Sequence, residues 1–211
     1  MNRPELIMVA GCNAAGKSSF IRSRMAQLED FIMIMTDVSK SSTKTDVRES
    51  IAAKKSIILE TVFNDASFKD LIDEARDAGY ATSLIALFLD SPTQSYKRVA
   101  ARIIDQAGLV ISAGNIKLNF NESFKNIALY YFYFDRSDFV YTGTAGENLL
   151  VMEFDKSTLR SYKPSDLTYP IKFAEFAHAN QRLNDETRNI ILKNESWVRE
   201  YTPQENPRLQ D

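Results

Sequence analysis

The sequence has one cysteine and one histidine among its 211 residues. A single cysteine cannot form a disulfide within the chain, and one residue of each type cannot build a metal centre of histidines and cysteines. No stretch approaches the roughly 18–20 apolar residues that a transmembrane helix needs. The apolar run at residues 6–10 is also shorter than the core of a signal peptide, which takes about 7–15 residues. We therefore predict a protein of the cytoplasm with no membrane partner.

An excess of charge of one sign is also missing. The 26 basic and 28 acidic side chains give a formal net charge of -2. Proteins that bind nucleic acids usually carry a basic excess, so the sequence predicts no nucleic-acid partner. With 44% hydrophobic and 26% charged residues, the composition is that of an ordinary globular protein.

Short apolar runs alternate with helix-like segments over most of the chain. This alternation is typical of right-handed crossovers and of a mostly parallel sheet with helices on both faces. We predict a three-layer α/β/α fold with five or six strands, forming one domain over residues 1–160. Residues 161–211 are predicted to extend that domain with a connector, a long helix over 171–197 and a loose tail over 201–211. The predicted strands are residues 5–10, 31–35, 56–59, 81–89, 139–141 and 149–154.

Residues 11–18, Gly-Cys-Asn-Ala-Ala-Gly-Lys-Ser, match the pattern G-x-x-x-x-G-K-[ST] of a phosphate-binding loop. The match follows a predicted strand and opens a predicted helix, as that loop requires. Its glycines let backbone N–H groups converge on phosphate oxygens, and the helix N-terminus favours the same anion. Lys17 is expected to reach the β- and γ-phosphates and Ser18 to bind Mg²⁺. The sequence thus predicts a P-loop NTPase or kinase fold that uses ATP and Mg²⁺, with further nucleotide contacts from Gly11, Asn13, Ala14, Ala15, Gly16 and Ser19.

Cys12 lies inside this loop. We interpret it as a passive small residue. The alternative is a redox-sensing thiol, since an anion-binding loop can lower the pKa of a cysteine.

Three acids follow predicted strands, where open α/β sheets bind their ligands. A kinase needs a carboxylate near the acceptor hydroxyl and acids that organise Mg²⁺. Asp37 is the preferred general base, and Glu60 is expected to hold either the acceptor or the water shell of the metal. Each has an ordinary alternative, a turn or cap for Asp37 and a surface acid for Glu60. Asp90 is more readily explained as a helix cap, because Ser-Pro follows it.

Arg98 and Arg102 lie one turn apart on a predicted helix. They are candidates for stabilising the charge on a transferring phosphate, and a solvent-exposed basic face is the alternative. For His178, the single histidine, a packing or surface role is expected.

Together with the phosphate loop and Asp37, residues 58–61 (Ile-Leu-Glu-Thr) and 97–102 (Lys-Arg-Val-Ala-Ala-Arg) resemble the zeta-toxin-like P-loop kinases over about residues 5–155. The resemblance implies transfer of the γ-phosphate of ATP to a hydroxyl of a small metabolite. In zeta toxins that metabolite is a nucleotide sugar, and an antitoxin can block the ATP site, so an antitoxin-like protein partner is implied too. By position, the implied roles are ATP and Mg²⁺ binding for Lys17 and Ser18, proton abstraction for Asp37, acceptor contacts for Glu60 and Thr61, and phosphate stabilisation for Arg98 and Arg102.

Two features depart from the family pattern. The segment between Asp37 and Glu60 is short, and the helix predicted after residue 115 lacks the arginines that relatives often carry there. These departures motivate one alternative, a catalytically degenerate ATP-binding regulatory module. A nucleoside or nucleotide kinase is a second alternative within the enzyme class.

Overall fold

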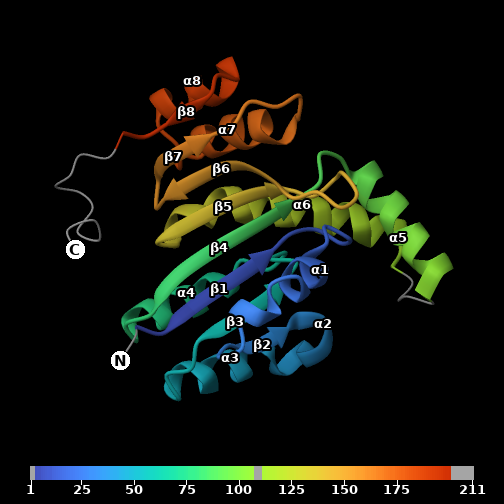
Figure 1. The fold of residues 1–211 in the computed structure, drawn as a ribbon, viewed down its shortest axis with the longest axis vertical. Helices are drawn as coiled ribbons and strands as arrows, with labels where there is room; N and C mark the ends of the chain where they lie inside the picture. The colour runs from blue at the N-terminus through green and yellow to red at the C-terminus, as the bar shows by residue number, and fades with distance from the viewer. Residues whose placement is uncertain (1–2, 107–110, 201–211) are drawn as a thin grey trace.

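The computed structural model describes residues 3–106 and 111–200, and within them it forms one eight-stranded sheet. The strand order is β2-β3-β1-β4-β5-β6-β7-β8 (Figure 1). The predicted loose tail, residues 201–211, lies outside the described residues.

The parallel half of the sheet contains β2 (Ile32–Met35), β3 (Ile57–Thr61), β1 (Glu5–Ala10), β4 (Ala81–Phe88) and β5 (Arg136–Tyr141). Its middle strand, β1, has a short apolar sequence because it is buried between neighbours on both sides. The helices α1 (Lys17–Arg22), α2 (Thr36–Ser39), α3 (Thr43–Ala52), α4 (Phe68–Asp77), α5 (Pro92–Gln106) and α6 (Ala113–Tyr130) connect these strands. The predicted α/β fold is confirmed.

The remaining strands add in antiparallel orientation: β6 (Leu149–Asp155), β7 (Thr158–Tyr162) and β8 (Trp197–Val198). The predicted number of strands was therefore too small. Only Leu159 and Tyr162 of β7 are buried, and β8 has two residues, so neither strand has a strong apolar signal in the sequence.

The helix predicted over residues 171–197 is two helices, α7 (Tyr169–Ala179) and α8 (Asp185–Lys193). Gln181 has a left-handed backbone with a φ of 59°, which ends the first helix. The Asn184 side chain then accepts a hydrogen bond from Thr187 N and caps the second. His178 Nε2 lies 2.8 Å from Asp185 Oδ1 and joins the two helices near the surface, in keeping with the predicted surface role.

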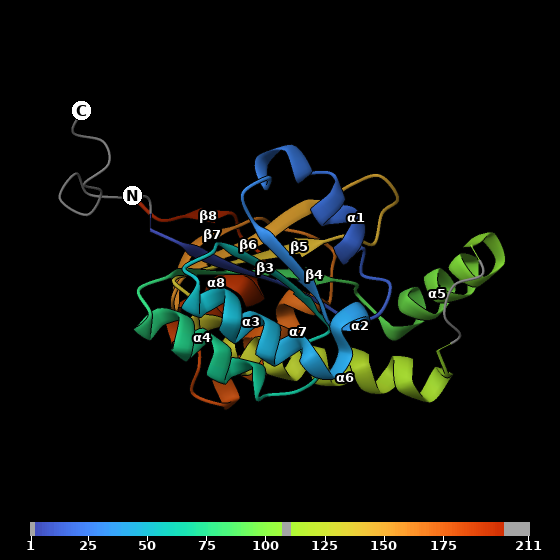
Figure 2. The same cartoon turned by 90° about the horizontal axis from the view of Figure 1, so that it is seen from below.

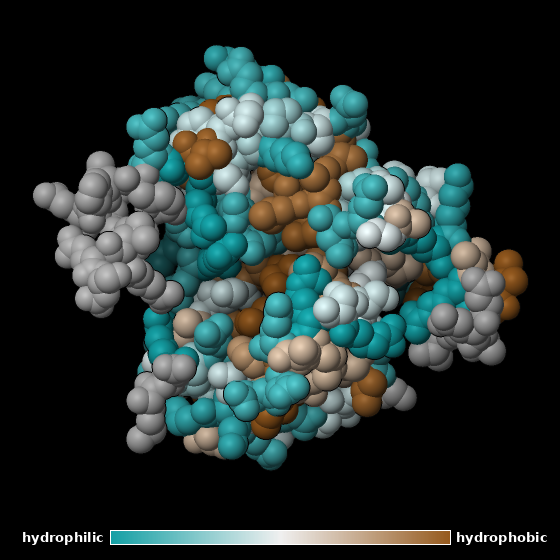
Figure 3. Space-filling view, viewed as in Figure 1, coloured by the Kyte–Doolittle hydropathy of each residue, from teal (hydrophilic) through white to brown (hydrophobic). Residues whose placement is uncertain are grey.

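Helices lie on both faces of the sheet, but unevenly (Figure 2). The larger core holds buried side chains of α3, α4, α6, α7 and α8, including Leu71, Ile127 and Phe173. On the other face, α1 packs Phe20 and Ile21 against the sheet. Burial of each such side chain contributes about 1.5–3 kcal/mol, so most of the core energy lies on the first face. Figure 3 shows apolar side chains at the centre of the face beside α1.

Several short elements complete the description. In the described part of the chain, 3-10 helices cover Met25–Gln27, Lys40–Ser42 and Tyr131–Tyr133. At the carboxyl ends of the parallel strands, α5 and the first part of α6 project beyond the sheet (Figures 1 and 2). Among the described residues, no helix has both the length and the apolarity to cross a bilayer.

Candidate active site

The loop between β1 and α1 curls because two of its residues have left-handed backbone angles. Ala14 and Gly16 have φ values of 57° and 85°. Gly11 is needed for a different reason: a Cβ there would lie 2.1 Å from the carbonyl oxygen of Leu87 in β4. The loop therefore packs directly on the neighbouring strand, and Lys17 follows it as the first, buried residue of α1.

All five carbonyl groups from residue 11 to residue 15 accept hydrogen bonds. Lys17 Nζ donates to Gly11 O at 2.9 Å and to Cys12 O at 3.2 Å. The next three carbonyls are bound from outside the loop, by Ser95 Oγ to Asn13 O (2.7 Å), Arg98 Nη1 to Ala14 O (3.3 Å) and Thr142 Oγ1 to Ala15 O (2.8 Å). With its oxygens engaged by the protein, the loop can present N–H groups to an anion.

Sequence reasoning missed Ser95 and Thr142. Thr142 directly follows β5, at the same sheet end as the acids, so the rule that ligands bind at carboxyl ends of strands applies to it as well. Ser95 stands three residues before Arg98 on α5, which places both on one helix face. No motif in the sequence points to a loop carbonyl as their partner.

Arg98 connects three elements. Besides Ala14 O, its guanidinium donates to the carbonyl of Thr142, so it ties α5 to the loop and to the end of β5. Arg102, one turn further along α5, is exposed. The structure thus separates the two arginines: Arg98 is held against the loop, and Arg102 has its side chain in solvent.

The pKa of Lys17 depends on several of the predicted site residues. Burial lowers its pKa below the ordinary value of 10.5, while the neighbouring Cys12, Glu60 and Asp37 act in the opposite direction. The positive charge of Arg102 lowers the pKa further. A phosphate bound to the loop would add negative charge and favour the protonated amine.

Glu60 is the penultimate residue of the buried strand β3 and is only 5% exposed. Its Oε1 accepts a hydrogen bond from Ser18 Oγ at 3.0 Å, whereas its buried Oε2 has no partner among the described residues. A buried carboxylate oxygen of this kind is costly unless a ligand or ion satisfies it. Hydroxyl and carboxylate oxygens are the donors that Mg²⁺ prefers, so Ser18 and Glu60 fit the metal that the loop implies.

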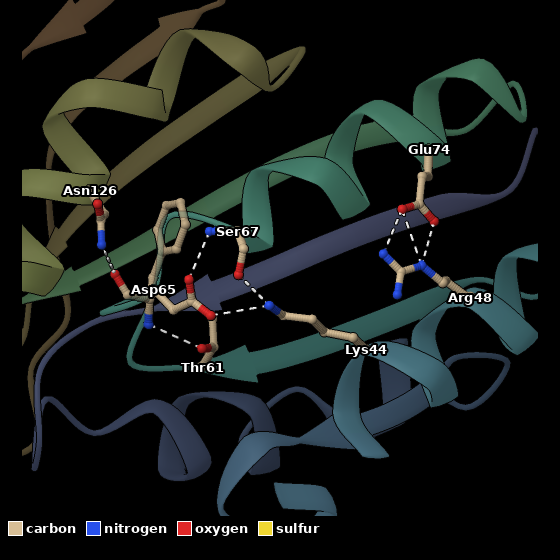
Figure 4. Close-up of polar contacts among 8 residues, drawn as sticks. Lys44, Arg48, Thr61, Asp65, Ser67, Glu74 and Asn126 are labelled. Carbon is tan, nitrogen blue, oxygen red and sulfur yellow. Dashed lines mark hydrogen bonds and ion pairs between the residues drawn. The ribbon is translucent and has the colours of Figure 1, made fainter. Parts of the chain in front are cut away.

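The backbone turns sharply after Thr61. Phe63 is fully buried with a φ of 55°, an unusual conformation for a large side chain. Two hydrogen bonds hold it there: Phe63 N donates to Thr61 Oγ1 at 3.0 Å, and Asn126 Nδ2 donates to Phe63 O at 2.9 Å (Figure 4).

Polar contacts from α3 hold the segment that follows this turn. Lys44 donates to Asp65 Oδ2 at 3.1 Å and also to Ser67 (Figure 4). On the same helix, Arg48 binds Glu74 of α4 through both carboxylate oxygens. The end of β3, which carries Glu60 and Thr61, is therefore anchored by elements on both sides.

Asp37 lies in the first turn of α2, directly after β2, with its side chain exposed. This is an open position at the carboxyl end of the sheet. Asp90 has a different environment, because its Oδ1 accepts hydrogen bonds from the backbone N–H groups of Thr168 and Tyr169, each at 2.7 Å. It is a helix cap, as interpreted from the sequence, but it caps α7 rather than the helix that follows it.

The redox hypothesis for Cys12 is wrong. The thiol is buried, and burial raises its pKa to about 11 in spite of the neighbouring Lys17. A reactive sensor needs an accessible thiol with a lowered pKa. Cys12 is a packing residue in the smaller core.

No protein-family model and no curated protein matches this chain. Solved structures do match it. The PezAT chromosomal toxin–antitoxin system of the human pathogen Streptococcus pneumoniae gives a TM-score of 0.59 at 13% identity, covering 92% of this chain and 89% of that one. The AvrRxo1-ORF1:AvrRxo1-ORF2 complex gives 0.61 at 13% identity, covering 93% and 77%. The same complex with ATP gives 0.59 at 13% identity, covering 92% and 77%.

The sheet and the loop between β1 and α1 define the P-loop kinase fold. Within that class, the resemblance to the zeta-toxin-like kinases predicted from the sequence is confirmed at the level of the fold. At 13% identity, the similarity carries the fold alone.

Proposed function

We propose that this protein is an ATP-dependent phosphotransferase that moves the γ-phosphate of ATP to a hydroxyl of a small metabolite. The observation that supports this most directly is the loop at residues 11–15, whose carbonyl oxygens are all engaged by the protein. Next to it stand a buried lysine and the Ser18–Glu60 pair. A fold neighbour solved with ATP adds support.

On the donor side, the backbone of residues 11–16 and the side chain of Lys17 would hold the phosphates, with Ser19 close to them at the start of α1. Ser18 would bind Mg²⁺, which neutralises charge on the phosphates when it is present. The Ser18 hydroxyl donates a hydrogen bond to Glu60, so the lone pairs of its oxygen stay available to a metal.

On the acceptor side, Asp37 would take the proton of the acceptor hydroxyl as that oxygen bonds to the γ-phosphorus. The bond from the γ-phosphorus to the bridging oxygen breaks, and ADP leaves with that electron pair. Glu60 and Thr61 are proposed to contact the acceptor from the end of β3. Arg98 and Arg102 are proposed to stabilise the transferring group, Arg98 through the loop that it holds and Arg102 from the open end of α5. A nucleotide sugar is the acceptor class that we propose first, and a protein that covers this site, as in a toxin–antitoxin system, is the proposed partner.

A second candidate is a regulatory module that binds ATP and transfers nothing. One observation favours it: the Arg98 guanidinium already donates to two backbone carbonyls, of Ala14 and Thr142, rather than standing free.

The two candidates differ in their products. Calorimetry with Mg-ATP tests the binding that both require. Incubation with Mg-ATP and a pool of nucleotide sugars and nucleosides, followed by mass spectrometry, tests transfer through the gain of one phosphate. A phosphorylated product with matching ADP supports the kinase. Binding without either product supports the module, and absence of Mg-ATP binding contradicts both.

A further inference from the structure

Three asparagine side chains form a hydrogen-bonded chain across the candidate site. Asn64 Nδ2 donates to Asn119 Oδ1 at 2.8 Å, and Asn119 Nδ2 donates to Asn13 Oδ1, also at 2.8 Å. Asn64 belongs to the turn after β3, Asn119 to α6 and Asn13 to the phosphate loop. One residue of α6 thus joins the donor side of the site to the acceptor side.

A second amide of α6 supports the same turn. Asn126 lies seven residues after Asn119, hence on the same helix face, and its Nδ2 donates to Phe63 O at 2.9 Å. The helix therefore holds two consecutive residues of the turn, 63 and 64. These contacts hold the backbone of the turn beside α6, and the Asn64 nitrogen donates to the side-chain oxygen of Asn119.

The chemistry of the amide gives the hydrogen bonds between these three asparagines a common direction. An asparagine side chain has one oxygen that accepts and one nitrogen that donates. The side-chain oxygen of Asn119 accepts a hydrogen bond from Asn64, so its nitrogen is the atom that faces Asn13. Asn13 must then turn its oxygen toward Asn119, which leaves its nitrogen, a donor, as the other polar atom of that side chain.

We propose that Asn119 is a positioning residue that orients the Asn13 amide so that its nitrogen, and not its oxygen, is offered to the nucleotide phosphates. The proposal rests on the proposed function, because it concerns the phosphates of ATP. Phosphate oxygens accept hydrogen bonds only from donors, and a reversed amide would bring a carbonyl oxygen against an anion. The turn after β3 would thereby determine which polar atom of the Asn13 amide faces the phosphates.

Asn119→Asp tests this orientation. The new carboxylate has no donor, so it can accept from Asn64 but cannot donate to Asn13, which is expected to turn its nitrogen toward the carboxylate. Asn121→Asp, at an exposed position of the same helix, adds the same charge and is the control. We expect Asn119→Asp to weaken Mg-ATP binding about tenfold beyond the control, the size of one lost hydrogen bond to a charged group.

A double-mutant cycle separates orientation from charge. In an Asn13→Ala background, Asn119→Asp should weaken Mg-ATP binding no more than Asn121→Asp does. A full effect of Asn119→Asp in that background, or equal effects of the two substitutions in the wild-type background, would overturn the proposal.

The nucleotide-free protein provides a readout that needs no ATP. Asn119→Ala should shift the side-chain amide NMR signals of both Asn13 and Asn64, whereas Asn121→Ala should leave both in place. If wild-type protein binds no Mg-ATP, the proposed function fails, and these signals then test the hydrogen-bonded amide chain alone. Shifts of both signals support the amide chain, and unmoved signals overturn it.

Discussion

Ser18 and Glu60 join the phosphate loop to the end of β3, through a hydrogen bond of 3.0 Å between the serine hydroxyl and Glu60 Oε1. The two residues are 42 positions apart in the sequence. The bond assigns the serine proton to the carboxylate, and the second oxygen of Glu60 stays buried without a partner in the described part of the chain. This pair is where a cation would compensate the buried negative charge.

Glu60→Gln should raise the Mg²⁺ concentration needed for ATP binding. Glutamine can still accept the hydrogen bond from Ser18, but it lacks the charge that favours a divalent cation. Calorimetric titration of ATP at several Mg²⁺ concentrations measures the change. Glu49→Gln, at an exposed position of α3, is the control. An unchanged Mg²⁺ dependence would exclude Glu60 from the metal environment.

ATP affinity should fall as pH rises through the lowered pKa of Lys17. In the nucleotide-free protein, burial favours the neutral amine, so the lysine loses its proton below its ordinary value of 10.5. Bound phosphates favour the charged amine, so above that lowered pKa binding must take up a proton. Calorimetry in buffers of different ionisation enthalpy detects this uptake. Lys17→Arg keeps a charge at all these pH values and should remove the uptake; proton uptake that persists in this variant would assign it to another group.

Thr142→Val should lower the free energy of unfolding and weaken the binding of ATP to the phosphate loop. The valine has a similar shape but cannot donate to the carbonyl of Ala15, a fully buried residue. We expect a loss of about 1–2 kcal/mol in the free energy of unfolding and weaker ATP binding. Denaturant unfolding and calorimetry measure the two effects. The exposed Thr144→Val should change neither, and the same result for Thr142→Val would show that the loop does not depend on this hydroxyl.

Asp37→Asn should abolish phosphate transfer and leave ATP binding nearly intact. The amide has almost the same shape as the carboxylate but cannot take the acceptor proton. Product mass spectrometry and calorimetry separate the two effects, with the exposed Asp30→Asn as control. Transfer that survives in Asp37→Asn would require a different base.

Local patterns in the sequence predicted the parts of the fold that depend on local physics. The apolar run at residues 5–10 predicts a strand, and these residues form the central strand of the parallel half of the sheet. The weak edge strands β7 and β8 were not predictable, because their pairing comes from neighbours and not from their own apolar residues.

The same limit applies to the site. Motif and topology predicted that Lys17, Glu60 and Asp37 lie near one another, and both acids act against the lowering of the pKa of Lys17 by burial. Ser95 binds a loop residue 82 positions away in the sequence, and Thr142 binds one that is 127 positions away. Asp90 caps α7 by binding a residue 78 positions away. Such contacts depend on how distant elements pack, which no local periodicity encodes.

The engaged carbonyls of the loop also have a kinetic consequence. Since protein groups bind all five carbonyls, the curl is held by the fold itself, and we expect its ordering entropy to be lost during folding rather than on binding. Association should then be limited by the encounter of protein and nucleotide, with a rate that rises linearly with ATP concentration and does not level off at a slow conformational step.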